Sequence, residues 1–374
     1  MKMKKVIWMM VLAATLVAGC CIEPPLHLRK AVKTKVTITT KVSVEMMWQV
    51  NWNTDWEFNW NPAVLGPLGY TLPASLRMHV FTQGSNGETI SHTVHNFMGD
   101  NAEMDVFVGT HDLLFHNNDS EALLFSQEDD FAPVMCYTRK ISSGLKASSP
   151  VYTPAQKAAG IGTKAEEPIE EPVSLMPEQL FSLYDKDQVI TDNPADYVFE
   201  DGKYILRIQG ELHPSTYIYL IQITLLNNNG RVIGSNAAAL TGMAGGVNLF
   251  TNEAWTSTVS VPMDVYIDKE QDMLGSKVFS FGNPGCNPYD DASVAAMPEQ
   301  DHYLVVNVAY VNGSNKNIRM DVTDQVRALP LGGVITLEID VDDFPPDESQ
   351  GGGGGFEALI SGWEEETGSA MIIN

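Results

Sequence analysis

Cysteine is scarce in this chain of 374 residues: there are four, and Cys20 and Cys21 are adjacent near the N-terminus. Only Cys136 and Cys286 remain for the body of the protein. We expect no disulfide between them, because they fall in different predicted domains. The sequence has no CxxC pair and no Cys/His cluster, so it gives no sign of a structural zinc site. Buried apolar surface must therefore stabilise the fold.

Positive charge is the second deficit. The chain has 23 Lys and Arg residues against 47 Asp and Glu residues, which gives a formal net charge of −24 at pH 7. Nucleic acid binding depends on cationic groups that neutralise phosphates, so no nucleic acid partner is expected. Most of the acidic residues are spread along the chain and are expected on solvated surface.

Catalytic and metal-binding signatures are missing as well. There is no GxSxG, no HExxH and no Cys/His nucleophile pair, and the glycine-rich run 242–246 lacks the Lys-Ser/Thr of a phosphate loop. His92 and His95 are three apart on an expected strand, which points them to opposite faces and prevents them from sharing a metal. His111, His116 and Asp119 are expected near a loop, where they could in principle ligate a metal or act as acid and base, but the sequence places no nucleophile beside them. We predict no catalytic residue, no metal, no cofactor and no enzymatic activity.

Long apolar runs are absent from most of the chain. A helix that spans the hydrocarbon core of a membrane needs roughly 20 apolar residues, and nothing after Cys20 approaches that length. The apolar run near the start, Val6–Ala18, is shorter than this and follows Lys2, Lys4 and Lys5. A basic start followed by a short apolar run is typical of a secretory signal peptide.

The end of that signal carries a lipobox. Leu16-Val17-Ala18-Gly19 places small residues before Cys20, as lipoprotein signal peptidase requires. We predict a signal peptide over residues 1–19 and an acylated Cys20 as the mature N-terminus. A tether over residues 20–32 then attaches the protein to a membrane, since two or three acyl chains on one residue give stable anchoring. An ordinary secretory signal without lipidation is the alternative.

What the sequence does contain is a series of short alternating segments. Residues 36–44 alternate β-branched and polar side chains, the period-two pattern of a half-buried strand. Similar segments, bounded by Asn-Gly and Asp-Gly turns, predict two β-sandwich domains. The predicted divisions are an N-terminal sandwich over 33–141, a Ser/Ala/Pro/Glu-rich linker or surface excursion over 142–177, a C-terminal sandwich over 178–346, and a Gly-rich joint and tail over 347–374.

Four tryptophans recur every four residues: Trp48, Trp52, Trp56 and Trp60. Polar residues alternate with them, which favours two strands around Asn53–Asp55 over a helix. Aromatic residues on one face of a sheet usually pack in a core or between domains. The alternative is an exposed platform on which the apolar faces of sugar rings stack, and these four tryptophans would then bind a glycan.

Several motifs, in their order after a lipobox, resemble a known family. They are His116–Glu121, Leu240–Gly246, Asp321–Val326 and Gly351–Phe356, the last followed by Trp363. Together they resemble a family of Bacteroidetes lipoproteins of unknown function that is grouped with fimbrillin and minor-fimbrium anchor proteins. The resemblance implies two tandem Greek-key, transthyretin-like β-sandwiches, with the motif residues as turn and packing positions and with no catalytic residues.

The same resemblance implies a function. It predicts a surface-exposed, lipid-anchored protein of the outer membrane that is an anchor or accessory subunit of a fimbria-like polymer and acts in cell adhesion. A fimbrillin-type subunit is then the expected partner, joined by strand exchange. The alternative is a glycan-binding surface lipoprotein of a polysaccharide-uptake system, which the tryptophans suggest.

Overall fold

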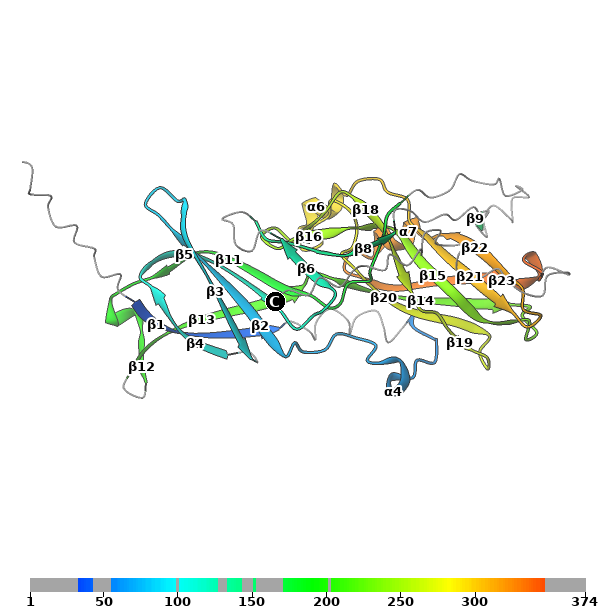
Figure 1. Ribbon diagram of the computed structural model, residues 1–374, viewed down its shortest axis with the longest axis horizontal. Helices are drawn as coiled ribbons and strands as arrows, with labels where there is room; N and C mark the ends of the chain where they lie inside the picture. The colour runs from blue at the N-terminus through cyan, green and yellow to red at the C-terminus, as the bar shows by residue number, and fades with distance from the viewer. Residues whose placement is uncertain are drawn as a thin grey trace, which may run out of the picture.

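The computed structural model is an elongated all-β molecule in which two groups of sheets lie end to end along the long axis (Figure 1). The structure describes residues 33–42, 55–98, 101–126, 133–142, 151–152, 171–200 and 203–346. The following stay predictions, because they concern residues outside those ranges: the signal peptide 1–19, lipidation of Cys20, the tether 20–32, the places of Trp48 and Trp52, most of the linker 142–177, and the tail 347–374.

The first group is an eight-stranded sheet that curls around an apolar core. Its strands are β1 (Lys33–Val42), β2 (Ser75–Gln83), β3 (Thr89–Met98), β4 (Asn101–Phe107), β5 (Gly109–Asn117), β11 (Phe181–Ile190), β12 (Val198–Glu200) and β13 (Lys203–Pro214). Their order is β3-β2-β5-β11-β13-β1-β4, with β12 paired to β13. Only two residues of chain separate β3 from β4 at opposite edges, so the sheet must curve. Leu76, Met78 and Val80 of β2 pack in the core with Phe115.

The strand pairing corrects the predicted division of the chain. The predicted second sandwich, 178–346, contains β13, which the alternating pattern predicts as a strand over 204–212, and β11, where a helical turn is expected over 177–184. Instead β11 pairs antiparallel with β5, and β13 pairs parallel with β1, with Val36 opposite Leu206. An alternating pattern identifies a strand but not its partner, because pairing joins segments that are distant in sequence.

The second group is a sandwich of two sheets, with orders β19-β20-β14-β23 and β8-β10-β18-β15-β21-β22-β9. Its strands are β8 (Lys140–Ser142), β9 (Val151–Tyr152), β10 (Val173–Ser174), β14 (Tyr217–Leu226), β15 (Val232–Ala244), β18 (Thr258–Met263), β19 (Tyr266–Asp268), β20 (Met273–Ser280), β21 (Tyr303–Tyr310), β22 (Asn315–Asp321) and β23 (Gly333–Asp340). Tyr219, Ile221 and Ile223 of β14 belong to the apolar core between these sheets. The predicted all-β sandwich architecture is confirmed. β9 and β10 come from the predicted linker, so part of that stretch pairs with this sandwich.

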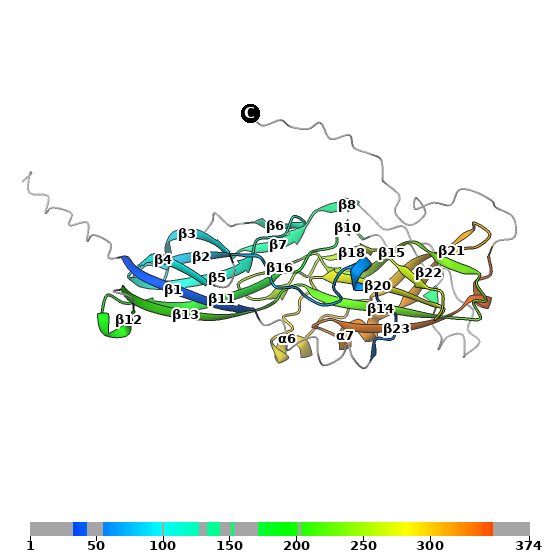
Figure 2. The same ribbon diagram turned by 90° about the horizontal axis from the view of Figure 1, so that it is seen from below.

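A smaller sheet joins the two groups. Its order is β17-β16-β7-β6, from β6 (Leu123–Ser126), β7 (Met135–Thr138), β16 (Gly246–Asn248) and β17 (Glu253–Ala254). Phe81 and Leu114 of the first sheet, Val247 of this sheet and Phe281 after β20 share one apolar cluster. Figure 2 shows β6, β7 and β16 lying between the two ends of the molecule. The two halves are therefore connected by shared apolar core contacts and not only by a linker.

Helices are few and short. They are α4 (Pro62–Leu65), α6 (Asp291–Ala295), α7 (Thr323–Ala328) and the 3-10 turns Pro194–Asp196 and Val341–Asp343. Within the part of the chain that the structure describes, no helix has the length and apolar character to cross a membrane. Cys136 and Cys286 are both buried, and no disulfide joins them.

Candidate functional site

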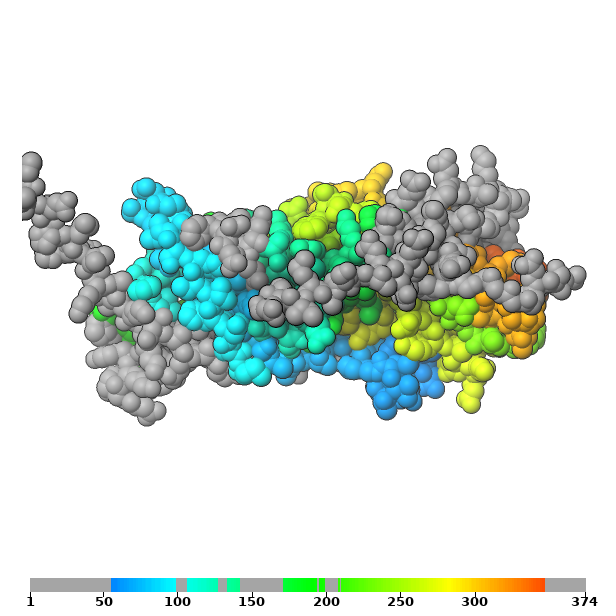
Figure 3. All heavy atoms as spheres, viewed as in Figure 1, coloured from blue at the N-terminus to red at the C-terminus, as the bar shows by residue number. Residues whose placement is uncertain are grey.

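Residues 55–74 form an extended segment that crosses the outer face of the second sandwich, and we call this segment the strap. Gln222 of β14 holds its backbone. The N–H groups of Glu57 and Phe58 donate to Gln222 Oε1 at 2.8 and 3.3 Å. Gln222 Nε2 donates in return to the Asp55 carbonyl at 2.7 Å. In Figure 3 the blue atoms of the strap lie against the yellow-green atoms of that sandwich.

The strap turns the outer face of β14 into a second core. Ile218 and Leu220 lie on the side of β14 opposite the sandwich core, yet both are fully buried, because Trp56 and its neighbours pack against them. The Phe58 ring lies directly over Gly275 of β20. A Cβ atom at that glycine would come within 2.5 Å of the ring, so the contact requires glycine.

Two of the four tryptophans lie in the strap. Trp60 Nε1 donates to the Gly66 carbonyl at 2.9 Å, and its ring meets Tyr266 edge-on at 5.8 Å. The rings of Trp56 and Trp60 are inclined by 62°, so these two do not form one flat platform. The prediction of a strand over residues 56–60 is wrong. The alternation there reflects which side chains contact the sheet beneath, and the segment pairs with no strand of the described residues.

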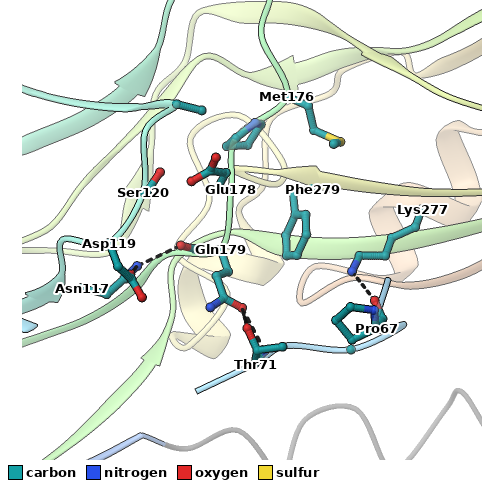
Figure 4. Close-up of a pocket in the computed structure, with 13 residues that line it drawn as sticks. Pro67, Thr71, Asn117, Asp119, Ser120, Met176, Glu178, Gln179, Lys277 and Phe279 are labelled. Carbon is teal, nitrogen blue, oxygen red and sulfur yellow. Dashed lines mark hydrogen bonds between the residues drawn. The ribbon is translucent and has the colours of Figure 1, made fainter. Parts of the chain in front are cut away.

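A cleft of about 420 Å³ opens where the two groups of sheets meet, and we call it the junction cleft (Figure 4). The strap, the turn after β5, residues 176–179 and β20 line it. Thr71 donates through its backbone N–H and its hydroxyl to Gln179 Oε1 at 2.9 and 3.1 Å. Asn117 Nδ2 donates to the Gln179 carbonyl at 3.1 Å. These bonds tie three of the four walls together.

The junction cleft carries opposite charges at its two ends. Lys277 Nζ donates to the Pro67 carbonyl at 2.7 Å and lies 4.8 Å from the centre of the Phe279 ring. Burial lowers the pKa of Lys277 to about 8. Asp119 and Glu178 lie on the far side of Phe279 in Figure 4, and each accepts a backbone N–H, at 2.7 and 3.1 Å.

Three histidines on neighbouring strands form a hydrogen-bonded chain. His92 Nε2 of β3 lies 3.0 Å from His79 Nδ1 of β2, and His79 Nε2 lies 3.1 Å from His116 Nε2 of β5. His116 Nδ1 lies 2.8 Å from the Asn117 carbonyl, which can only accept. His116 therefore carries its proton on Nδ1, His79 donates to it from Nε2, and His92 donates to His79.

The expectation that His116 lies near a loop is consistent with the structure, where it is the next-to-last residue of β5, and His111 lies further inside the same strand. Both belong to β5 and both are fully buried. Burial lowers the pKa of His79 to about 3 and that of His116 to about 4, so both are neutral at physiological pH. The expected separation of His92 from His95 is consistent with the structure: His92 stacks on Phe81, whereas His95 approaches Thr93. The spacing of these histidines in the sequence could not reveal their hydrogen bonds, because only the pairing of the strands brings His92, His79 and His116 together.

Two of the sequence motifs meet at His302. The His302 N–H donates to Thr323 Oγ1 at 2.9 Å, and the Tyr303 N–H donates to Thr241 Oγ1 at 3.1 Å. Gly242 has φ +74° and packs so tightly that a Cβ atom there would lie 2.3 Å from the Asp301 carbonyl. Thr241 and Gly242 are packing positions, as the resemblance implies, but they lie within strand β15 and not in a turn.

The edge of the first sheet is the remaining candidate site. β3 lies at the end of the strand order and, within the described residues, pairs on one side only, with β2. Ile90, Val94 and Met98 recur at every fourth position and are 58%, 42% and 74% exposed. Native edge strands usually carry charge or proline to discourage further pairing, and this one has neither.

The fold defines an all-β protein whose two halves are joined by a shared sheet and an outer strap. Among the residues described, no His, Cys, Asp or Glu cluster is placed to hold a metal ion. The chain belongs to the family described as a domain of unknown function (DUF5119), whose pattern matches residues 47–264. The expected membership of a family of unknown function is thereby confirmed. No curated protein matches the chain in sequence.

Several solved structures resemble this one to different degrees. A candidate adhesin from Bacteroides ovatus is 12% identical with a TM-score of 0.50, over 86% of this chain and 96% of that one. The fimbrial anchor protein Mfa2 from Porphyromonas gingivalis is 9% identical with a TM-score of 0.42, over 82% and 91%. The tip fimbrial protein Mfa3 from the same organism is 9% identical with a TM-score of 0.35, over 77% and 81%. At such low identity these likenesses concern the fold alone.

Proposed function

We propose that this protein is a lipid-anchored structural protein of the cell envelope, an anchor or accessory subunit of a fimbria-like surface polymer that acts in cell adhesion. The observation that carries the proposal is the edge strand β3, with its exposed apolar residues and its single paired side. A partner strand adds to such an edge through main-chain hydrogen bonds. A fimbrillin-type subunit is the partner we propose for it. The role needs no catalysis, and we propose that the protein is not an enzyme.

Anchoring in this proposal rests on the lipobox. Acyl chains on Cys20 would hold the mature protein at the outer membrane, with the body facing the cell exterior. Replacement of Cys20 by Ala should move the protein from the detergent phase to the soluble fraction in a phase-partition experiment. A variant that still partitions with detergent would contradict lipidation while leaving the proposed strand pairing intact.

A charged residue on the edge strand tests the pairing. Val94→Lys places an ammonium group at the middle of β3, where it disfavours the addition of another strand. The side chain is already partly exposed, so we expect a folded protein that no longer co-purifies with polymer from detergent extracts. Val64→Lys on α4 is the matched control, because Val64 is 76% exposed and distant from β3 in sequence. Undiminished co-purification with Val94→Lys would contradict pairing at this edge.

Glycan binding by the tryptophan-rich segment is the second candidate function. A surface hollow of about 630 Å³ beside the strap is lined by Trp56, Trp60 and Gln271, which favours it. Trp48 and Trp52 lie outside the described residues. Trp60→Ala should then keep the fold and lose retention on a polysaccharide gel. Equal migration of the variant and the native protein would remove this candidate.

A further inference from the structure

The junction cleft has the size and rigidity of a small-molecule site. Its volume of about 420 Å³ falls in the range of ligand pockets, which runs from roughly 300 to 1,000 Å³. Its walls come from segments far apart in sequence, and hydrogen bonds of Thr71 and Asn117 to Gln179 fix them to one another. A ligand would therefore meet groups that are already in place.

One cation in the cleft is not matched by an anion. An ammonium group has three N–H donors, and Lys277 uses one of them for the Pro67 carbonyl. No carboxylate lies within 4.0 Å of Lys277 Nζ anywhere in the described ranges, although the chain has 47 Asp and Glu residues. Burial alone lowers the pKa of Lys277, with no acidic neighbour to raise it. An anionic group of a ligand would satisfy the remaining donors.

The rest of the lining is suited to hydroxyl groups and to an apolar ring face. Asp119, Ser120 and Glu178 supply oxygen acceptors at the end opposite Lys277, as Figure 4 shows. Phe279 lies between the two ends, and Met176 adds apolar surface that is partly exposed. A ligand for this cleft therefore has one anionic end, an apolar face in the middle and hydroxyl donors at the other end.

We propose that the junction cleft binds an acidic sugar of the uronic acid class. The sugar carboxylate would pair with the Lys277 ammonium, one face of the ring would lie on Phe279, and ring hydroxyls would donate to Glu178 and Ser120. A peptide ending in a free carboxylate shares the anionic group but lacks several hydroxyl donors for the acidic end. The site is separate from the tryptophans of the strap and from the edge of β3, so it does not rest on the proposed fimbrial role.

Galacturonate and its neutral counterpart galactose are the probes for this site. We would titrate each into the full mature protein in detergent and follow binding by calorimetry and by saturation-transfer NMR. The native protein should bind galacturonate at least about tenfold more tightly than galactose, because only the former has the carboxylate. Absence of saturable galacturonate binding, or equal binding of the two sugars, would overturn the proposal.

Lys277→Met keeps the length of the side chain and removes its charge. We expect this variant to bind galacturonate at least about tenfold more weakly. Lys316→Met is the matched control, because Lys316 Nζ also donates to a proline carbonyl, that of Pro345, at 2.8 Å. Galacturonate binding should be unchanged in the control. Unchanged binding in Lys277→Met would contradict the assignment of the anionic subsite.

Two measurements on the native protein cover the case in which Lys277→Met fails to fold. Raising the salt concentration from about 0.05 M to about 0.5 M should weaken galacturonate binding, because screening acts on the ion pair. Binding should also weaken as the pH rises through about 8, where Lys277 loses its proton. Insensitivity to both would contradict the ion pair. A dipeptide with a free carboxylate that binds this cleft more tightly than galacturonate does would identify a peptide site and overturn the assignment to an acidic sugar.

Discussion

The two halves of the molecule treat their outer strand faces in opposite ways. In the second sandwich β14 carries apolar residues on both faces, and the strap covers the outer one. In the first sheet β3 leaves Ile90, Val94 and Met98 exposed along an edge. The first half also buries polar groups such as His79 and His116 between its layers. The strap thus covers the outer face of the second half, whereas the first half keeps an apolar edge strand exposed and buries three histidines, against one in the second half.

The largest expected effect comes from removing the ring that closes the second half. Phe58→Ala should lower the free energy of unfolding by about 4 kcal/mol, because a buried aromatic ring is lost and Gly275 is left without its cover. Denaturant unfolding measures the loss. Val64→Ala in the same strap is exposed and should change stability by less than about 0.5 kcal/mol. Equal stabilities for the two variants would show that the strap does not contribute to this core.

Low pH should destabilise the first half more than the second. The pKa values of His79 and His116 in the folded protein, about 3 and about 4, lie below the ordinary value of 6.5. The unfolded chain therefore binds more protons than the folded one at intermediate pH, and stability falls as the pH drops below about 6.5. Between pH 7 and pH 5 each histidine should cost about 2 kcal/mol. In the second half the corresponding residue is His302, whose pKa burial also lowers to about 4.

Hydrogen exchange resolves where this acid sensitivity lies. After correction for intrinsic rates, peptides from β2 and β5 should lose more protection between pH 7 and pH 5 than peptides from β14 and β20. Three fully buried histidines lie in the first half, His79, His111 and His116, and one in the second, His302, so the loss should be unequal. A uniform loss of protection along the chain would mean that the two halves unfold together, and it would contradict a greater acid sensitivity of the first half.

A smaller effect should follow from a single methyl group beneath the strap. Gly275→Ala forces its Cβ to within 2.5 Å of Phe58 and should cost about 2 kcal/mol. Gly234→Ala in β15 is the matched control, since a Cβ atom added at Gly234 would have no other atom within 4 Å. In the double variant with Phe58→Ala the two losses should be less than additive, because the clash is gone. Strict additivity would contradict a direct contact between strap and sheet.

The smallest effect is expected at the surface of the second half. Arg231 and Asp342 form an ion pair of 2.6 Å whose side chains are 28% and 62% exposed. Asp342→Asn should lower stability by about 0.5 kcal/mol or less, and the difference should vanish in high salt. A loss comparable to that of Gly275→Ala would show that surface charge, and not the covered sheet, holds this half together.

Many of the strands could be predicted from the sequence. Period-two alternation reports the local environment of each residue, so the strands from β2 to β5 and the strands β14, β15, β18, β20, β21 and β23 could be expected one by one, whereas β16, β17 and β22 were not. Their partners could not, because β11 and β13 return to the first sheet through contacts across large separations. The strap shows the reverse error: Trp56 and Phe58 alternate like a strand because alternate side chains contact β14 and β20.

The candidate sites were less accessible than the fold. The histidine chain assembles residues from three strands, and only the pairing of β3, β2 and β5 brings them within hydrogen-bonding distance. Lys277 has no distinctive neighbour in sequence, and the absence of an opposite charge becomes visible only in the folded cleft. The sequence was also misleading at Gly242, where the small-residue run predicts a turn: this residue has φ +74° inside strand β15, at an irregularity in the pairing with β18.

Crosslinking at the edge of β3 in intact cells directly tests whether a partner subunit pairs with this strand. Ile90→Cys, made together with Cys21→Ser, introduces a thiol on the exposed strand β3, whereas native Cys136 and Cys286 are buried. Val64→Cys on the strap is the control. We expect a short bis-maleimide to join Ile90→Cys to a second subunit that carries its own cysteine at the facing strand, whereas Val64→Cys should stay monomeric. Monomer alone from Ile90→Cys in cells with assembled polymer, or the same products from both variants, would contradict it.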